Sequence, residues 1–371
     1  MFNVIDRNPG FKIFQVINIF RNKFHPVDDE NLLFFGYARG ALFAILKSLG
    51  LKKGDGVLVP SYICDVVIHQ IEALDLDPIY YRVDKNLKID FNSLGEHVVT
   101  RSKVFISINY FGFSQEFLGI GKLTNEKNLV WINDNAHGFS SHLFEKSLDA
   151  YGDVSITSFR KSIPSINGAY LKINNSKKID RQALKKILEL YTVECISFKL
   201  LIAKVFGVFK IRLKKYPDFS NFSLFKDTRN MQYKVNESSR ILMNKPDVFE
   251  MQKRRIKIYL GIKYFIEQNY SSIKVPDLYE DGNVPLNFPI IVENKNLWLE
   301  ILRISRKEGV DIHTWPSLPS EVLGNNIYGA YDLWQKWLFL PLHQNLELAT
   351  YLERLSMVLS QIGQYEQIHK V

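Results

Sequence analysis

Short apolar runs alternate with helix-like hydrophobic patterns along the first half of the chain. The stretch 38–51 places Ala41, Ile45 and Leu49 on one helical face and predicts a helix, and 64–76 predicts another. Strands are predicted within 57–60, 77–84, 102–112, 128–138, 151–157 and 169–173. Strands separated by helices of this length are typical of parallel βαβ units, so we expect an α/β fold with a mostly parallel sheet flanked by helices.

The last third of the chain predicts a smaller α/β region. Its pattern indicates a long helix over 245–269, a strand within 285–294, a helix over 297–310 and a terminal helix from about Leu346. A chain of 371 residues is long enough for two domains. We therefore expect a large domain over 1–245 and a small C-terminal domain over 246–371.

Composition is that of an ordinary folded protein, with 46% hydrophobic and 23% charged residues. Cys64 and Cys195 are too few for a disulfide framework or a zinc site, which fits a reducing cytoplasm. The N-terminus lacks the pattern of a signal peptide, and no uncharged apolar window of about 18 residues predicts a membrane span. We expect a cytoplasmic protein.

The net charge of +9 is compatible with nucleic acid, an anionic membrane or a phosphorylated substrate. Lysines and arginines are spread along the chain, and no nucleic-acid-binding signature appears, so we expect no nucleic acid partner. The eight histidines lack ligand spacing, so we expect no metal. The basic, apolar segment 196–215 either lies on a membrane surface or, as we favour, packs against the protein or a second subunit.

Polar residues with chemical potential follow several predicted strands. Ligands bind beyond the carboxyl ends of strands in open α/β sheets. Asp134 and His137 lie near the end of the segment 128–138, just past its apolar strand. Asp134 either caps a following helix or keeps a heterocyclic nitrogen protonated, as a pyridinium cofactor requires.

A second group lies in the turn "SFRK", after the predicted strand 151–157. Lys161 is either a solvated turn residue or, if buried beside Arg160, an amine with a lowered pKa that forms a Schiff base with an aldehyde. Ser155, Thr157 and Ser158 offer hydroxyl groups to a phosphate.

Two further positions are candidates for binding. Arg39 and Gly40 open the predicted helix over 38–51, and the free amides at a helix N-terminus favour an anion. Tyr62 either stacks on a planar ring or belongs to the core.

The order and spacing of these motifs carry a family resemblance. The motifs are "RGAL" at 39–42, "GDGVLVPSYIC" at 54–64, "INYFG" at 108–112, "INDNAHG" at 132–138 and "SFRKSIPSINGAYL" at 158–171. Together they resemble the DegT/DnrJ/EryC1/StrS family of pyridoxal-phosphate sugar aminotransferases, in particular the branch whose lysine lies in an "SxRK" turn. The resemblance runs from about Phe34 to Leu171 and resumes in "NFPIIVEN", "GVDIHTWPSLP" and "WLFLPLHQNL".

The resemblance implies the fold-type I transferase architecture, a homodimer with sites at the subunit interface, and pyridoxal 5'-phosphate as cofactor. It implies that Lys161 is the Schiff-base lysine and proton shuttle, and that Asp134 pairs with the pyridine nitrogen. By position, the other expected contacts are His137 beside the ring, Ser158 with Arg39 and Gly40 at the phosphate, and Tyr62 or Cys64 near the ring face.

The chain departs from the family pattern at the phosphate segment. "YAR" at 37–39 replaces the usual "SGT", and "INGA" at 166–169 replaces "GEGG". The stretch before Lys161 is also shorter than usual, so Ser158 competes with Ser155 and Thr157 as the phosphate ligand.

The implied reaction moves an amino group, usually from glutamate, to a keto group of a nucleotide-linked deoxysugar, for surface polysaccharides or glycosylated products. The family also contains dehydratases with histidine in place of the lysine, and Lys161 argues against that branch. A non-catalytic relative that binds cofactor or sugar nucleotide, and a membrane-surface protein, remain the alternatives.

Overall fold

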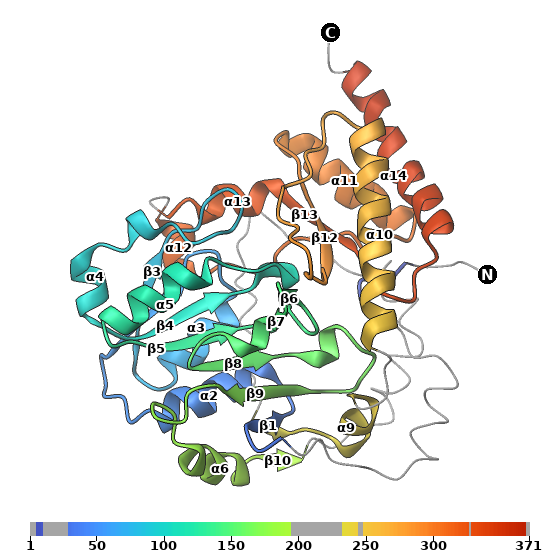
Figure 1. Ribbon diagram of the computed structural model, residues 1–371. Coiled ribbons are helices and arrows are strands. Elements are labelled where there is room, and N and C mark those ends of the chain that lie inside the picture. Colours follow the sequence, from blue (N-terminus) through green and yellow to red (C-terminus); the bar gives the residue numbers. More distant parts are fainter. Residues whose placement is uncertain (1–4, 10–28, 194–231, 244–247, 326–327, 369–371) are drawn as a thin grey trace.

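Seven strands form a central sheet in the spatial order β1-β9-β8-β5-β4-β2-β3 (Figure 1). The computed structural model describes residues 5–9, 29–193, 232–243, 248–325 and 328–368. The sheet strands are β1 (Leu32–Phe35), β2 (Gly56–Pro60), β3 (Asp77–Tyr81), β4 (Ser102–Ile108), β5 (Val130–Asp134), β8 (Val154–Thr157) and β9 (Ala169–Ile173).

Six strands of this sheet run in one direction. Every neighbouring pair from β3 across to β8 is parallel, whereas β9 is antiparallel to both β8 and β1. The reversal arises because β8 and β9 are joined directly by the segment 158–168, which carries Lys161. The predicted α/β class with a mostly parallel sheet is confirmed.

Helices cover both faces of the sheet. They are α2 (Ala38–Ser48), α3 (Asp65–Glu72), α4 (Glu96–Thr100), α5 (Phe117–Glu126) and α6 (Arg181–Glu189). Helices α2 and α3 pack against each other, and α5 packs on β5 (Figure 1). The connections through α2 and α3 lead toward the β3 edge of the sheet, whereas the connection through α5 leads from β4 to β5, in the opposite direction. Because such crossovers are right-handed, α2 and α3 lie on one face of the sheet and α5 lies on the other.

The sequence of these elements explains their burial. All five residues of β2 are buried, as expected for a central strand with helices on both faces. Helix α2 buries a stripe that includes Leu42, Ile45 and Leu46, so its apolar face turns toward the sheet. The hydrophobic pattern therefore fixes which side of each element meets the core.

Short elements fill the connections. They are α9 (Glu237–Met243), α12 (Ser320–Gly324), α13 (Ala330–Lys336), the 3-10 turns η1 (Phe91–Ser93), η2 (Tyr110–Gly112), η3 (Leu148–Ala150) and η4 (Phe159–Lys161), and the paired strands β6 (His142–Leu143) with β7 (Lys146–Ser147) and β10 (Thr192–Val193) with β11 (Tyr233–Lys234). Two of the turns, η2 and η4, directly follow β4 and β8 and contribute to the site described below.

A second, antiparallel sheet pairs β12 (Asn287–Ile291) with β13 (Trp337–Pro341). Helices α10 (Val248–Asn269) and α11 (Lys295–Lys307) both pack against α14 (Leu348–Ile368), beside this sheet (Figure 1). These elements agree with the strand and helices predicted for the last third of the chain. The predicted domain boundary at 245/246 falls within 244–247, outside the described residues, so the two-domain division stays a prediction.

One strand of the central sheet lies beyond the reach of the sequence patterns. Strand β1 is not predicted, because "LLFF" does not alternate and is too short to distinguish from a helical segment. The basic segment 196–215 lies outside the described residues. Across the described part of the chain, no helix is both long and apolar enough to span a membrane.

Replacing Asp153 with alanine is expected to destabilise the protein. The buried carboxylate of Asp153 accepts hydrogen bonds from the backbone N–H of Trp131 at 2.9 Å, from Asn175 Nδ2 at 2.7 Å and from Lys178 Nζ at 3.1 Å. Its loss leaves the buried N–H of Trp131 without its acceptor and Lys178 without its anionic partner, so we expect the free energy of unfolding to fall by about 2–4 kcal/mol in urea unfolding.

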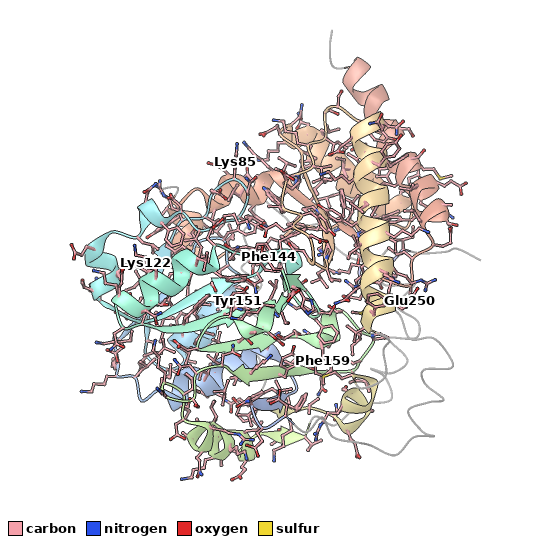
Figure 2. The ribbon with its side chains drawn as sticks, in the orientation of Figure 1. Lys85, Lys122, Phe144, Tyr151, Phe159 and Glu250 are labelled. Atoms are coloured by element: carbon pink, nitrogen blue, oxygen red, sulfur yellow. The ribbon has the colours of Figure 1, made fainter. Side chains whose placement is uncertain are left out.

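The matched control is Glu126→Ala, which removes the exposed partner of Lys122 on α5 (Lys122 is labelled in Figure 2). An exposed ion pair contributes little, so this variant should change the free energy of unfolding by less than about 0.5 kcal/mol. Equal effects of the two substitutions would contradict the role given to Asp153.

Candidate active site

The carboxyl ends of six strands lie at one edge of the central sheet. All strands except β9 run in the same direction, so their last residues lie along this edge. The chain leaves β2 outward to β3 and returns to β4 on the other side of β2. Such a reversal opens a crevice beyond the strand ends, where open α/β sheets bind ligands.

A cavity of about 430 Å³ lies at this edge. Residues after β1, β5 and β8 line it together with residues 313–316 from the C-terminal part of the chain. Those that carry charge or acid–base chemistry include Arg39, Asp134, His137, Ser158, Arg160 and Lys161. The structure thus brings five of the seven predicted site residues to one cavity, namely Lys161, Asp134, His137, Ser158 and Arg39.

Lys161 ends the short turn η4, which is held from several sides. Its backbone N–H donates to the Ser158 carbonyl at 3.1 Å, and the Arg160 N–H donates to the Gly168 carbonyl at 3.2 Å. Phe159 packs in a small apolar cluster with Met251 of α10, near the end of that helix where Glu250 is labelled (Figure 2). The lysine therefore projects from a supported turn.

Gly168 allows the ring of Phe159 to occupy this position. Its φ is +144°, and a Cβ placed on it would lie 2.1 Å from the Phe159 ring. The N–H of Gly168 also donates to the Gly36 carbonyl at 2.7 Å, which ties the turn to the end of β1. The "NG" pair in the sequence thus has a steric reason, since any side chain at 168 would displace the aromatic ring.

Lys161 and Asp134 form the electrostatic centre of the cavity. Burial is the main cause that lowers the pKa of the Lys161 amine to about 8. The charge of Asp134 raises this pKa, and the charge of Arg160 lowers it further. Burial raises the pKa of the Asp134 carboxyl, while the charge of Lys161 and the N–H of Ala136, 2.9 Å from Oδ1, lower it. Asp134 closes a turn rather than capping a helix, since β5 is followed by no helix before β6.

The position of His137 fixes its tautomer. The backbone N–H of Phe111 donates to Nδ1 of His137 at 3.2 Å, so the neutral ring carries its proton on Nε2. Burial lowers the pKa of His137 well below its ordinary value, and the charges of Lys161 and His313 lower it further. Phe111 stacks on the imidazole at 5.6 Å between centroids, and Trp315 meets it edge-on at 5.8 Å.

This contact depends on an unusual backbone conformation. Phe111 adopts a φ of +55° and Gly112 follows at +89°, both in the left-handed region. The ring of Phe111 also stacks on Phe339 of β13 at 4.2 Å between centroids. A non-glycine residue held at positive φ beside a cavity is typical of a functional site.

The cationic wall of the cavity lies near the start of α2. Tyr37, Ala38 and Arg39 line it, and the Arg160 guanidinium packs over the Tyr37 ring at 5.1 Å. Ser158 lines the same cavity. Backbone amides at a helix start, two guanidinium groups and a hydroxyl are the donors that a phosphate group requires.

The other two hydroxyl candidates are occupied elsewhere. Ser155 Oγ donates to the Asp149 carbonyl at 2.7 Å, and Thr157 Oγ1 accepts from Asn135 Nδ2 at 3.0 Å. Neither residue lines the cavity, whereas Ser158 does. Of the three hydroxyls left open by the sequence, the geometry favours Ser158.

Two predicted site residues are not brought to the cavity wall. Gly40 is buried in α2, where its carbonyl accepts from the Tyr191 hydroxyl at 2.8 Å. Tyr62 is buried behind Trp315, with ring centroids 5.1 Å apart. Cys64, the alternative to Tyr62, does line the cavity, and burial raises the pKa of its thiol to about 11.

Several lining residues were not predicted as site residues from the sequence. Arg7 and Asn8 reach the cavity because Ile5 pairs with Val310 of the C-terminal part, a contact that no local pattern reveals. His313 and Trp315 also line it; from the sequence, their segment could either approach the site or have a structural role, and the two alternatives stayed open. Among the described residues no group of three or more metal-ligating side chains is found.

Sequence comparisons find similarity mainly in the first half of the chain. Residues 30–183 match the sequence model described as the DegT/DnrJ/EryC1/StrS aminotransferase family. The chain is similar to the GDP-perosamine synthase of Escherichia coli O157:H7, 26% identical over 144 residues, which is 38% of this chain and 40% of that protein. For this and two further curated relatives, the match spans 35% to 40% of the relative's own length.

Solved structures share the fold over nearly the whole chain. Helicobacter pylori PseC, an aminotransferase involved in the biosynthesis of pseudoaminic acid, has a TM-score of 0.75 at 14% identity, covering 98% of this chain and 100% of that one. The PLP form of the putative sugar aminotransferase Spr1654 from Streptococcus pneumoniae has a TM-score of 0.72 at 16% identity, covering 97% and 100%. At these identities the likeness establishes the fold alone.

Replacing Gly168 with alanine is expected to disturb the Lys161 turn. The added methyl group clashes with the buried Phe159 ring and must adopt a positive φ, so we expect a loss of about 2–4 kcal/mol in the free energy of unfolding. Gly50→Ala is the control, because Gly50 has a φ of +64° and no atom within 4 Å of the place that a methyl group would take. A loss at Gly168 no larger than at Gly50 would argue against the clash.

Replacing Lys161 with methionine should stabilise the protein at neutral pH. The pKa of Lys161 is lowered to about 8 in the folded chain, so the unfolded chain binds more protons above that pH and wild-type stability rises between about pH 8 and 10.5. The methionine variant lacks this dependence. Its advantage in urea unfolding should therefore be largest below pH 8 and shrink toward pH 10.5; a constant difference across this range would contradict the lowered pKa.

Proposed function

We propose that this chain, whose residues 30–183 match the DegT/DnrJ/EryC1/StrS aminotransferase family, is a member of that family and a pyridoxal 5'-phosphate-dependent sugar aminotransferase. The observation that carries the proposal is the lysine in the cavity. Lys161 has a pKa lowered to about 8 and shares the cavity with the carboxyl group of Asp134. An amine that loses its proton near neutral pH is the nucleophile that a carbonyl cofactor requires.

The residues of the cavity fit the cofactor in chemistry and in number. Lys161 supplies the amine, and Asp134 supplies a carboxyl group for the ring nitrogen. Arg39, Arg160 and Ser158 supply donors for the phosphate, beside the amide groups that open α2. The set has partners for the aldehyde, the ring nitrogen and the phosphate of pyridoxal phosphate.

Pyridoxal phosphate, when bound, supplies an aldehyde for the amine and a protonated ring that withdraws electrons from the reacting carbon. Asp134 keeps the ring nitrogen protonated, because a carboxylate and a pyridinium form a charge-assisted hydrogen bond. The charge of Lys161 favours the ionised form of Asp134.

Lys161 also moves the proton. With a pKa of about 8, its amine both accepts a proton from the substrate carbon and returns it at physiological pH. His137, neutral and protonated on Nε2, is a fixed hydrogen-bond donor beside the ring. Phe111 and Trp315 hold this imidazole in place and exclude water around it.

The amino acceptor is a nucleotide-linked keto deoxysugar, and the donor is an amino acid, with glutamate the first choice. Arg39 and Arg160 give the cavity positive charge beyond that of Lys161, which suits a diphosphate. The similarity to a GDP-perosamine synthase supports the same substrate class. We infer a cytoplasmic homodimer that acts in surface polysaccharide or glycoside biosynthesis, with a large domain over 1–245 and a small one over 246–371.

A non-catalytic relative that binds the cofactor or the sugar nucleotide is the second candidate. It is favoured by the altered segments "YAR" and "INGA" at the phosphate end of the site. It would retain Arg39 and Ser158 as ligands but would not need an amine of low pKa at 161.

The test is the visible absorption of the purified protein with pyridoxal phosphate. The wild type should develop the band of the cofactor joined to a lysine amine, and glutamate should bleach it. Lys161→Ala should lack the band, because no other lysine lines the cavity among the described residues. Asp134→Asn should keep the band but lose at least about tenfold in the rate of bleaching, since the ring nitrogen loses its anionic partner.

Three results would count against the proposal. No band in the wild type would exclude the cofactor, and a band that persists in Lys161→Ala would assign the amine elsewhere. A band that glutamate and other amino acids leave unchanged would favour the non-catalytic binder. Lys185→Ala, on the outer face of α6, is the control and should behave as the wild type.

A further inference from the structure

Arg255 of α10 is a buried cation without a carboxylate partner in the described part of the chain. Its side chain is 1% exposed. Nε donates to Gln344 Oε1 at 3.0 Å, Nη1 donates to the Pro285 carbonyl at 3.2 Å, and Nη2 donates to the Ser162 carbonyl at 3.0 Å. All three acceptors are neutral, and no ion pair found among the described residues includes Arg255.

Such a residue is unfavourable for stability alone. Transfer of a charged group out of water is costly, and neutral acceptors recover less of that cost than a carboxylate does. Burial accordingly lowers the pKa of Arg255 to about 9. An apolar side chain of similar size would satisfy a purely structural need at lower cost, so the retained charge calls for a function.

The acceptors of Arg255 lead to the candidate active site along two paths. Ser162 directly follows Lys161 and caps the turn η4. Its carbonyl accepts a second bond, from Gln344 Nε2 at 3.0 Å. Gln344 itself is held by Arg255, so the carbonyl next to the lysine carries two donors that support each other.

The second path reaches the wall beside His137. Pro285 precedes Leu286, which lines the cavity and donates its N–H to the Phe111 carbonyl at 2.7 Å. Phe111 is the residue whose own N–H binds His137. One guanidinium group therefore connects α10, the segment before β12 and the segment after β13 with both the lysine and the histidine of the site.

We propose that Arg255 is a positioning residue: together with Gln344 it holds the Ser162 carbonyl and thereby keeps the Lys161 amine inside the cavity. The inference rests on the proposed function in taking Lys161 as the reacting amine. A lysine cannot replace the arginine fully. The planar guanidinium group reaches three separate acceptors at once, whereas a lysine has a single ammonium nitrogen.

Loss of Arg255 should change the titration of Lys161. Once the Ser162 carbonyl loses a donor, the turn relaxes and the amine gains access to water, which raises its pKa toward the ordinary value. The charged or titratable groups that interact with Lys161 are Asp134, Arg160, Cys64, Arg39 and His137, while His343 faces Arg255, and all of them remain in the variants.

The experiment measures the reactivity of each lysine in the full chain without cofactor. The protein is treated with propanal and cyanoborohydride across pH 6–11, and the alkylated peptides are quantified by mass spectrometry. In the wild type, Lys161 should react with a midpoint near pH 8. In Arg255→Gln the midpoint should rise by about one pH unit, so the rate at pH 7 should fall about five- to tenfold.

Two milder variants and a control complete the design. Arg255→Lys keeps the charge but not the fork, and Gln344→Met removes the second donor to Ser162 while Arg255 remains. Both should raise the midpoint by a smaller amount. Arg303→Gln, which removes an exposed arginine of α11 that pairs with Glu300, should leave the midpoint of Lys161 unchanged.

The outcomes separate positioning from a structural role. Variants that melt at lower temperature but keep the wild-type midpoint of Lys161 would overturn the inference. If Arg255→Gln does not fold, Arg255→Lys and Gln344→Met decide the matter by the same criterion. A wild-type Lys161 that titrates like exposed lysines would overturn this inference as well, whereas the cofactor band described above tests the proposed function separately.

Discussion

The candidate active site depends on keeping one amine out of water beside one carboxyl group. Lys161 follows β8 and Asp134 ends β5, and these strands are parallel neighbours, so their ends fall at the same edge of the sheet. Burial opposes the charge on each group, and each charge supports the other. Much of the surrounding structure serves to hold this pair: the turn η4, the glycine at 168, the left-handed turn at Phe111 and the buried Arg255.

The site is assembled from parts of the chain that are distant in sequence. The central sheet contributes strand ends, α2 contributes its first turn, and residues 313–316 close the cavity from the C-terminal part. Interactions between these parts are made at the turns, as in the stacking of Phe111 on Phe339 and the bonds from Arg255 to Ser162. The geometry of the lysine is thus set by contacts that span more than ninety residues of sequence.

The sequence predicts the scaffold well because local pattern decides it. Buried strands such as β2 and amphipathic helices such as α2 follow from hydrophobic spacing, and ligand-bearing residues follow from the rule on strand ends. The placement of Lys161, Asp134 and His137 at one cavity agrees with that rule, although their roles stay predictions. The sequence does not reveal long-range contacts. Arg7 reaches the cavity because the isolated bridge between Ile5 and Val310 brings its segment there, and Tyr62 is buried against Trp315.

The choice among nearby hydroxyls shows the same limit. Ser155, Thr157 and Ser158 are equivalent in sequence, and only the packing of Asp149 and Asn135 distinguishes them. The alternation of side chains along β8 could have favoured one face, but it does not say which face meets the cavity. Tertiary contacts supply that information.

The most direct test of the central claim is a covalent map of the lysine that binds the cofactor. The protein with bound pyridoxal phosphate is reduced with borohydride, digested and analysed by mass spectrometry. We predict a single major site of modification, on the peptide that contains Lys161, at one cofactor per chain. Modification spread over surface lysines, or centred on another lysine, would contradict the claim.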